Sequence, residues 1–230
     1  MKVKLINYTP NPERTVAAAA RLCYSAVGAE TLLERFTREE ELKLLEKLIT
    51  SGHLSPLEHA NFTFAVEGIS RALSHQLVRH RIASYSQQSQ RYVLEKNFEY
   101  IIPPSVKRNP EGLAVFKETM EEINQAYQKL VELVPKEDAR FVLPQASETK
   151  IVFTFNARSL LNFFEHRLCQ RAQWEIRHLG RLMLMEVKKV APVLFAKAGP
   201  TCETAGICYE GEFSCGRAAI IKSRATNTSS

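Results

Sequence analysis

Residues 148–187 change part of the way along from the residue pattern of a strand to that of a helix, and their sequence is ETKIVFTFNARSLLNFFEHRLCQRAQWEIRHLGRLMLMEV. The first part, Glu148 to Phe155, reads as a β-strand. The rest has the apolar spacing of a long helical region, in which we expect one break near residues 168–171. A strand that leads directly into such a region favours an α+β fold. The apolar residues on the inner side of the helical region are Leu160, Leu161, Phe164, Leu168, Ile176, Leu179, Leu182, Met183 and Val187.

Residues ahead of this region predict more elements of both kinds. Alternating apolar residues indicate short strands at residues 3–7 and 61–67. A few strands covered by several longer helices is the architecture that this order of elements favours. Helical spacing predicts helices at residues 12–25, between Thr37 and Gly52, at residues 70–80 and at residues 111–134.

Three helix starts carry recognisable capping sequences. Asn11 stands before a proline, which suits an N-cap followed by proline at the first helical position. Thr37 with Glu40, and Ser55 with Glu58, each have the spacing of a capping box. We therefore expect a side-chain cap at each of these three positions.

The composition indicates one globular domain. The chain has 230 residues, 45% hydrophobic and 24% charged, and no Ser/Gly/Pro-rich linker divides it. We expect residues 1–221 to form a single domain and residues 222–230 to be a disordered tail. The net charge of +6 fits anionic small ligands and does not by itself argue for nucleic acid. Because no run of about eighteen apolar residues occurs, we expect a cytoplasmic protein that does not cross a membrane.

The five cysteines do not predict a disulfide framework or a metal site. Their number is odd, so reduced thiols are expected. Cys202, Cys208 and Cys215, in the C-terminal segment 199–217, lack a Cys-x-x-Cys pair, which argues against zinc. His75 and His80 are five residues apart, the wrong spacing for two ligands on one helical face. The C-terminal segment receives no function from the sequence.

Residues 79–92, RHRIASYSQQSQRY, have the composition of an anion-binding segment. From Arg79 to Arg91 they hold three arginines, three serines and three glutamines but no acidic residue. Guanidinium groups, hydroxyls and amides suit a phosphate joined to a hydrogen-bonding heterocycle. We expect an irregular loop here, after a helix, and not a core strand. On composition alone, a solvated basic face and a nucleic-acid contact are the alternatives.

The order of these residues resembles that in the flavin-dependent thymidylate synthases. RHR, a gap of seven residues, Ser89 and then Arg91 is the signature of that family. Further segments resemble the family in the same order along the chain, and together they are far more specific than any one alone. The resemblance covers roughly residues 18–190. The other segments are GHLSPLEHANFTF before the signature and EDARFVLP, NARSLLNF and AQWEIR after it.

The resemblance implies a methyltransferase that converts dUMP to dTMP. In that family, methylenetetrahydrofolate donates the carbon, FAD carries the reducing equivalents and NADPH reduces the FAD again. The implied architecture is an antiparallel β-sheet flanked by long α-helices, in a homotetramer whose sites are shared between subunits. dUMP and a folate are then the expected partners, and a single chain should be a poor enzyme.

The same motifs imply roles for individual residues. Arg167 matches the catalytic residue that stabilises the ionised uracil ring, and a guanidinium suits this role because it stays charged. The implied dUMP contacts are Gln76, Arg79, Gln87, Gln88, Ser89, Gln90, Arg91, Arg140 and Arg167. The implied FAD contacts are Ser55, Arg79, His80, Arg81, Gln87, Asn156, Arg158 and Asn162.

Two positions qualify this assignment, and two other classes of function compete with it. Many relatives have an acid at the position of Gln87, where an amide can form hydrogen bonds but cannot act as a base. Ser89 has no evident base partner, so we interpret it as a ligand contact and not a nucleophile.

A nucleic-acid-binding module is the first competing function, although only Tyr85 and Tyr92 could stack on bases. A protein that kept both sites but lost turnover is the second.

Overall fold

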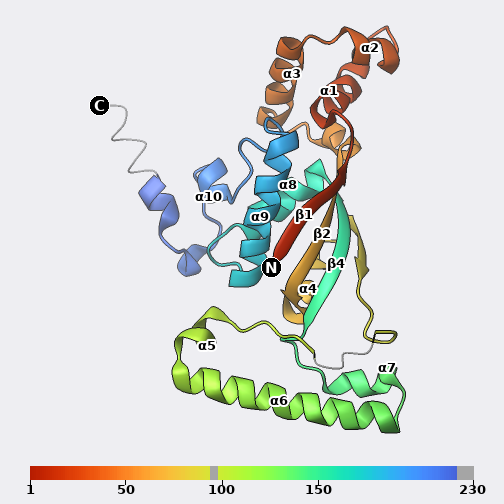
Figure 1. The fold of residues 1–230 in the computed structure, drawn as a ribbon. Coiled ribbons are helices and arrows are strands. Elements are labelled where there is room, and N and C mark those ends of the chain that lie inside the picture. The colour runs from red at the N-terminus through yellow and green to blue at the C-terminus, as the bar shows by residue number, and fades with distance from the viewer. Residues whose placement is uncertain (94–97, 222–230) are drawn as a thin grey trace. The chain divides into compact units, whose positions relative to one another are not determined.

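The computed structural model describes residues 1–93 and 98–221 (Figure 1). Its sheet is antiparallel and has the strand order β1-β2-β4-β3. The prediction of an α+β fold is confirmed at the level of an antiparallel sheet combined with helices. The expected disordered tail at 222–230 lies outside the described residues. The strands are β1 (Lys2–Tyr8), β2 (Asn61–Ser70), β3 (Ala83–Gln87) and β4 (Glu148–Asn156).

The chain divides into two compact units that are interleaved along the sequence. Unit 1 consists of Met1–Lys2, Ala65–Arg79 and Tyr85–Val152. Unit 2 consists of Val3–Phe64, His80–Ser84 and the chain from Phe153 onward. Each strand therefore contributes residues to both units.

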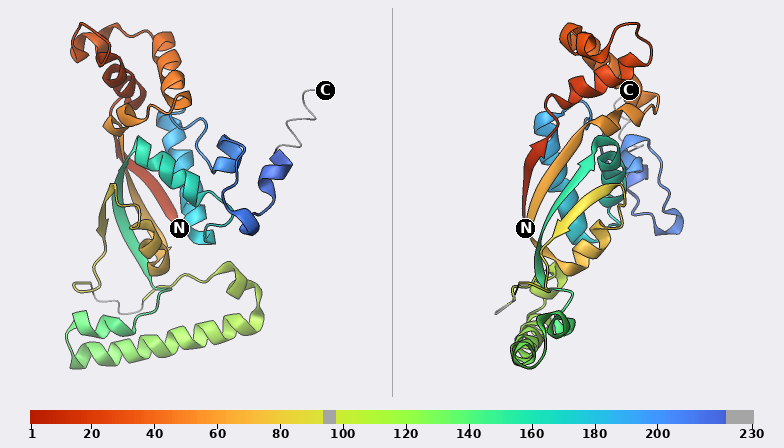
Figure 2. Two further views of the ribbon diagram at one scale, coloured as in Figure 1. Left: turned by 180° about the vertical axis from the view of Figure 1, so that it is seen from behind. Right: turned by 90° about the vertical axis from the view of Figure 1, so that its right-hand side faces the viewer.

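Unit 1 is mainly helical outside the strands. Its long helix α6 buries only Met120 and Tyr127 and leaves apolar residues such as Val115 exposed. In both views of Figure 2, α7 lies along α6. Its helices are α4 (Arg71–Leu77), α5 (Pro104–Arg108), α6 (Pro110–Leu133), α7 (Lys136–Ala139) and the 3-10 helix η2 (Arg140–Val142).

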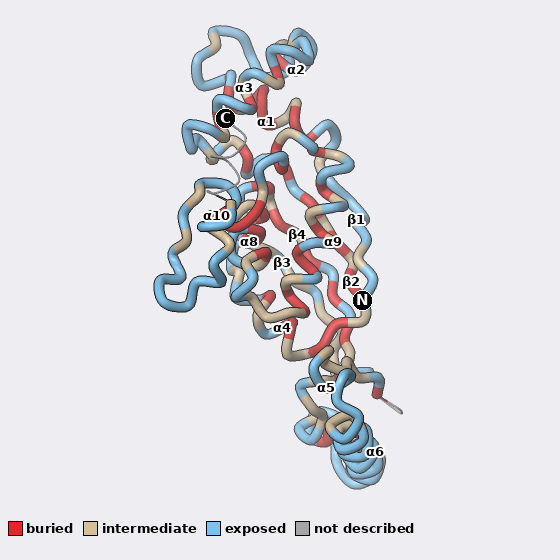
Figure 3. Tube along the Cα trace, turned by 90° about the vertical axis from the view of Figure 1, so that its left-hand side faces the viewer, coloured by how far each residue is buried: buried red, intermediate tan, exposed pale blue. Residues whose placement is uncertain are grey.

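Unit 2 contains a phenylalanine-rich core. The ring of Phe195 lies 5.4 Å from that of Phe62 and 5.9 Å from that of Phe164, both in edge-to-face geometry. Helices α8 and α9 are each buried along one side and exposed along the other (Figure 3). Its helices are α1 (Pro12–Leu22), α2 (Ala29–Arg35), α3 (Arg38–Thr50), η1 (Ser55–His59), α8 (Ala157–Arg167), α9 (Trp174–Val190), α10 (Thr201–Thr204) and η3 (Gly211–Phe213).

One of the three predicted side-chain caps is confirmed. The Thr37 hydroxyl accepts from the Glu40 amide at 3.3 Å, while the Glu40 carboxylate accepts from the Thr37 amide at 3.0 Å. The predictions for Asn11 and Ser55 are wrong. Asn11 has a left-handed backbone (φ 46°), and its side chain forms no capping hydrogen bond. Ser55 is itself the first residue of η1, so no capping box forms there.

The prediction of an irregular loop at residues 79–92 is wrong for residues 83–87. The helix expected to reach residue 80 ends at Leu77, and Ala83–Gln87 forms strand β3. Side chains of this strand alternate between half-buried and exposed. Polar residues are accepted in it because β3 is at the edge of the sheet, where one side of the strand is unpaired. The predicted helix break is confirmed, since α8 ends at Arg167 and α9 begins at Trp174.

Candidate active site

Arg167, the last residue of α8, forms a hydrogen bond with His80. Its Nε donates to His80 Nε2 at 3.0 Å, across 87 positions of sequence. The imidazole also packs edge-on against Phe163, with 5.0 Å between the ring centroids. The two terminal nitrogens of Arg167 donate to no residue of the described chain. They are therefore available to a ligand.

Burial determines the charges of this pair. Desolvation, together with the smaller effects of the Arg167 and His166 charges, lowers the pKa of His80 to about 4. At neutral pH the ring is therefore uncharged, and its Nε2 can accept the hydrogen bond. Burial also lowers the pKa of Arg167, but a guanidinium stays protonated at any working pH. The result is a half-buried cation whose orientation is set by a neutral acceptor.

This pair predicts a loss of stability in mild acid. The pKa of His80 is lower in the folded chain than in the unfolded chain, so between pH 6.5 and about 4 the unfolded chain binds the extra proton. Stability that is fully present above pH 6.5 is lost as the pH falls, by at most about 3 kcal/mol. Urea unfolding at pH 7 and pH 5 should show this loss in the wild type and a smaller loss in H80Q. Equal losses of stability in both proteins would show that His80 is not the group responsible.

The start of α8 lies against η1, which brings several of the residues implied in FAD binding together. Asn156 caps α8 by accepting from the Ser159 amide at 2.8 Å. Arg158 pairs with Glu58 of η1 at 2.6 Å, and both side chains are about half exposed. Ser55 is the exposed first residue of the same 3-10 helix. A ligand anion could thus reach Arg158 by displacing an exposed carboxylate.

Gln87 is part of a hydrogen-bonded group in unit 1. Its Nε2 donates to Ser74 Oγ at 3.0 Å and to Thr149 Oγ1 at 3.2 Å. Ser74 and Thr149 are 1% and 0% exposed. The next residue, Gln88, is held through its backbone, since its carbonyl accepts from Arg71 Nη2 at 2.8 Å. The end of β3 is therefore fixed by buried polar contacts.

Arg91 and Arg140 meet at Glu137. The Arg91 Nε and Nη2 lie 2.7 and 2.6 Å from the same carboxylate oxygen of Glu137. Arg140 Nε donates to the Glu137 carbonyl at 3.0 Å. Ser89 is close by, because its hydroxyl accepts from the Arg91 amide at 3.2 Å. Sequence reasoning missed Glu137, whose only signal was an acid three residues before Arg140.

The remaining predicted residues are less tightly placed. The side chains of Arg79 and Arg81 are exposed and form no hydrogen bond or ion pair with a residue of the described chain. Asn162 is exposed on α8. Gln76 donates to the Ala72 carbonyl at 3.4 Å, and Gln90 has a buried Nε2 without a partner in residues 1–93 and 98–221.

The two predicted sets of ligand contacts fall in different units. Arg167 excepted, the residues implied in dUMP binding belong to unit 1. Arg79 and Gln87 excepted, the residues implied in FAD binding belong to unit 2. The structure thus gathers each set largely within one compact body.

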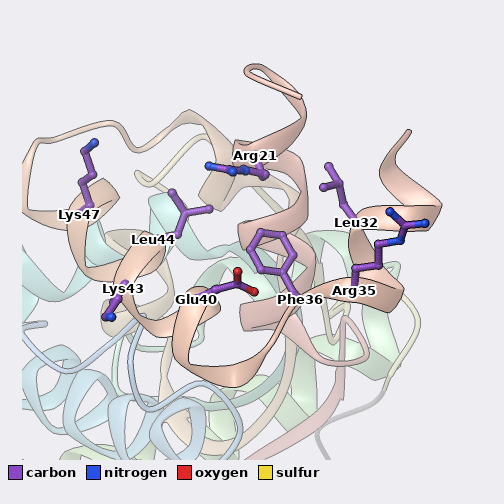
Figure 4. A pocket seen from close by; sticks show the side chains of 8 residues that line it. All are labelled: Arg21, Leu32, Arg35, Phe36, Glu40, Lys43, Leu44 and Lys47. Atoms are coloured by element: carbon purple, nitrogen blue, oxygen red, sulfur yellow. The ribbon is translucent and has the colours of Figure 1, made fainter. Parts of the chain in front are cut away.

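A hollow of about 420 Å³ lies among α1, α2 and α3 of unit 2 (Figure 4). It contains none of the residues that the family resemblance implies in ligand binding. Its one carboxylate, that of Glu40, is bound to Thr37. Its lining consists of Arg21, Leu32, Arg35, Phe36, Glu40, Lys43, Leu44 and Lys47.

The C-terminal cysteine segment is attached to the loop that follows Arg167. Arg171 of that loop lies 3.9 Å from the Glu210 carboxylate and 5.3 Å from the centre of the Phe213 ring. Cys202 is buried, and the five thiols are free. Burial raises the pKa of the Cys202 thiol, which keeps it protonated and unreactive at neutral pH.

The described residues offer neither a metal-binding cluster nor a membrane-spanning helix. Within residues 1–93 and 98–221, no group of three or more His, Cys, Asp or Glu side chains is placed to hold a metal ion. No helix in residues 1–93 or 98–221 has both the length and the hydropathy needed to cross a bilayer.

Comparison with known proteins gives consistent matches. A family model described as thymidylate synthase complementing protein matches residues 4–193, which include both sets of predicted contacts. The chain is 53% identical to the flavin-dependent thymidylate synthase of Clostridium tetani, over 96% of each chain. It is 54% identical to that of Geobacter sulfurreducens, over 96% of this chain and 97% of the relative. With that of Pyrococcus furiosus the identity is 45%, over 91% and 90%.

Proposed function

Because the chain belongs to the thymidylate synthase complementing protein family, we propose that it is a flavin-dependent thymidylate synthase. Its reaction would be the reductive methylation of dUMP to dTMP. Methylenetetrahydrofolate would donate the carbon and NADPH the electrons. The structural observation that supports this proposal is the hydrogen bond of 3.0 Å between Arg167 and His80, which leaves a half-buried cation whose terminal nitrogens have no partner among the described residues.

Arg167 is the proposed catalytic residue. Carbon five of uracil is a poor nucleophile until the ring gains negative charge, and a fixed cation beside the ring stabilises that charge. Arg167 is suited to this because burial strengthens its field and its terminal nitrogens are unoccupied within the described chain. His80 would act as a positioning residue through the Arg167 Nε.

FAD is the proposed cofactor, and the residues of unit 2 fit it chemically. A pyrophosphate needs cations, which exposed Arg81 and Arg158 offer, and a flavin ring forms hydrogen bonds such as those of the Asn162 amide. Arg158 would exchange the Glu58 carboxylate for the ligand anion. Ser55, His80 and Asn156 complete the proposed contacts in this unit. When bound, FAD would supply the reducing equivalents, and NADPH would renew them.

The polar residues of unit 1 are the proposed binding site for dUMP. The phosphate suits Arg91 and Arg140, which already meet at one carboxylate-bearing residue. The other proposed contacts are Gln76, Arg79, Gln87, Gln88, Ser89 and Gln90. In a homotetramer with shared sites, the two sets of contacts for one active site need not come from one chain. We also propose the antiparallel fold of this family and a cytoplasmic location.

Glu137 should weaken dUMP binding. Its carboxylate occupies the Arg91 guanidinium and would repel an incoming phosphate, so nucleotide binding must displace it. Both side chains are about half exposed, so the pair is worth at most about 1 kcal/mol. E137Q should therefore lower the KM for dUMP by up to about fivefold with little change in kcat. A KM that rises instead would mean that Glu137 helps to place Arg91.

The visible absorption spectrum of the purified protein tests the proposed function. Flavin bands should be present, or appear on adding FAD, and should bleach when NADPH is added without oxygen and with dUMP. Formation of dTMP should then depend on methylenetetrahydrofolate. A protein that takes up no FAD would refute the proposal. One that binds FAD and dUMP without forming dTMP would have lost turnover.

A further inference from the structure

We propose that Ser74 and Thr149 are positioning residues that present the Gln87 carbonyl oxygen to an imide N–H of a bound ligand. The proposal rests on the proposed function, which supplies two ligands with such a group. The ring of uracil and the isoalloxazine ring each carry one imide N–H between two carbonyls.

Both hydrogens of the Gln87 amide are already used. Its Nε2 lies 3.0 Å from Ser74 Oγ and 3.2 Å from Thr149 Oγ1. A carboxamide nitrogen has only two hydrogens to donate, so no donor is left for a ligand. The orientation of the whole amide follows from these two contacts.

Ser74 determines which group donates and which accepts in its hydrogen bond with Gln87. Its hydroxyl donates to the Arg71 carbonyl at 2.9 Å, and a hydroxyl has one hydrogen. Toward residue 87, Ser74 can therefore only accept. Because Ser74 is 1% exposed, reversing the arrangement would leave a buried polar group unsatisfied.

The opposite end of the amide is open. Gln87 Oε1 accepts from no described residue, and it is not among the side-chain atoms buried without a partner. It can only accept, so a ligand must bring a hydrogen to it. A carboxylate at this position would place a second acceptor against Ser74, so the amide of Gln87 matches the hydrogen bonding of its surroundings.

Binding of paired ligands tests the inference. The FAD-loaded protein is titrated with dUMP and with its 3-methyl analogue, and the FAD-free protein with FAD and N3-methyl-FAD. Each methylated ligand lacks the imide hydrogen. The wild type should discriminate against the methylated form of one ligand pair. T149V and S74A should each reduce that discrimination by about three- to tenfold, the value of one hydrogen bond.

Controls separate positioning from general damage. T149S keeps the hydroxyl and should restore discrimination. T154V removes a hydroxyl from the same strand, where it pairs with Thr63 at 2.9 Å, and should leave discrimination unchanged. If the variants lose discrimination only between dUMP and its 3-methyl analogue, uracil is the donor. If they lose it only between FAD and N3-methyl-FAD, the flavin is the donor.

Two results would overturn the inference. The first is a wild type that binds the methylated and unmethylated members of each ligand pair equally. This result does not depend on whether any variant folds. The second is folded T149V and S74A proteins with wild-type discrimination. A wild type that binds neither FAD nor dUMP would instead refute the proposed function.

Discussion

Replacing Arg167 with leucine should lower kcat by about a hundred- to a thousandfold, the usual cost of removing one group that stabilises developing charge. The reason is that the Arg167 guanidinium is half-buried and its terminal nitrogens can donate hydrogen bonds to the substrate. Neither water nor a cation from the solvent can replace it there. The measurement is kcat at saturating dUMP and folate, together with the flavin spectrum. The spectrum should be retained, because loss of the side chain affects the charge on the substrate and not the fold.

Matched variants make this result specific. R181L removes an exposed arginine from α9 and should leave kcat unchanged. H80Q keeps an acceptor for the Arg167 Nε and should cost much less than R167L. If R167L retained kcat within about threefold of the wild type, the charge on the ring would have to be stabilised elsewhere.

R38M should lower the free energy of unfolding by about 3 kcal/mol, the low end of the range for breaking a buried ion pair. Arg38 Nη2 lies 2.5 Å from Glu13, and Nη1 pairs with Glu41. The two glutamates are 4% and 2% exposed, so R38M leaves buried carboxylates without this partner. The low end applies because the Arg38 side chain is itself 53% exposed.

Thermal unfolding of two further variants tests this cause. K43M, on the same helix, breaks a pair with Glu39 in which both side chains are more than three-quarters exposed, and should change stability by less than about 0.5 kcal/mol. R38M/E13Q/E41Q removes the buried charges as well and should recover much of the loss. If the triple variant were as unstable as R38M, packing of the arginine stem would be the cause.

Local sequence signals predicted much of the fold. The Thr37 capping box and the break between α8 and α9 are confirmed because each depends on residues within one or two helical turns. Strand β3 was missed because its residues are polar, and only their edge position in the sheet makes that acceptable. Helix α2 (Ala29–Arg35) was not predicted, since seven residues carry too little periodicity.

The candidate site was predicted as a set of residues but not as a set of contacts. Motif order named Arg167 and His80 separately, and neither motif could indicate that one donates to the other across 87 positions. The only signal for Glu137, an acid shortly before Arg140, applied equally to its neighbour Asp138. The role of Ser74 and Thr149 is likewise non-local, because the hydroxyls come from a helix and a strand 75 residues apart. Contacts of this kind depend on the tertiary fold.

The buried Glu13 carboxylate has a consequence for synthesis on the ribosome. Its other oxygen accepts from the Val193 amide at 2.6 Å, across 180 positions. At about 5–20 residues per second, translation reaches Val193 roughly 10–40 seconds after Glu13. During that interval an early helix carries a carboxylate whose final donor does not yet exist. Unit 2 therefore cannot complete its folding before Val193 has been synthesised, and nascent chains that stop earlier should be more susceptible to proteases.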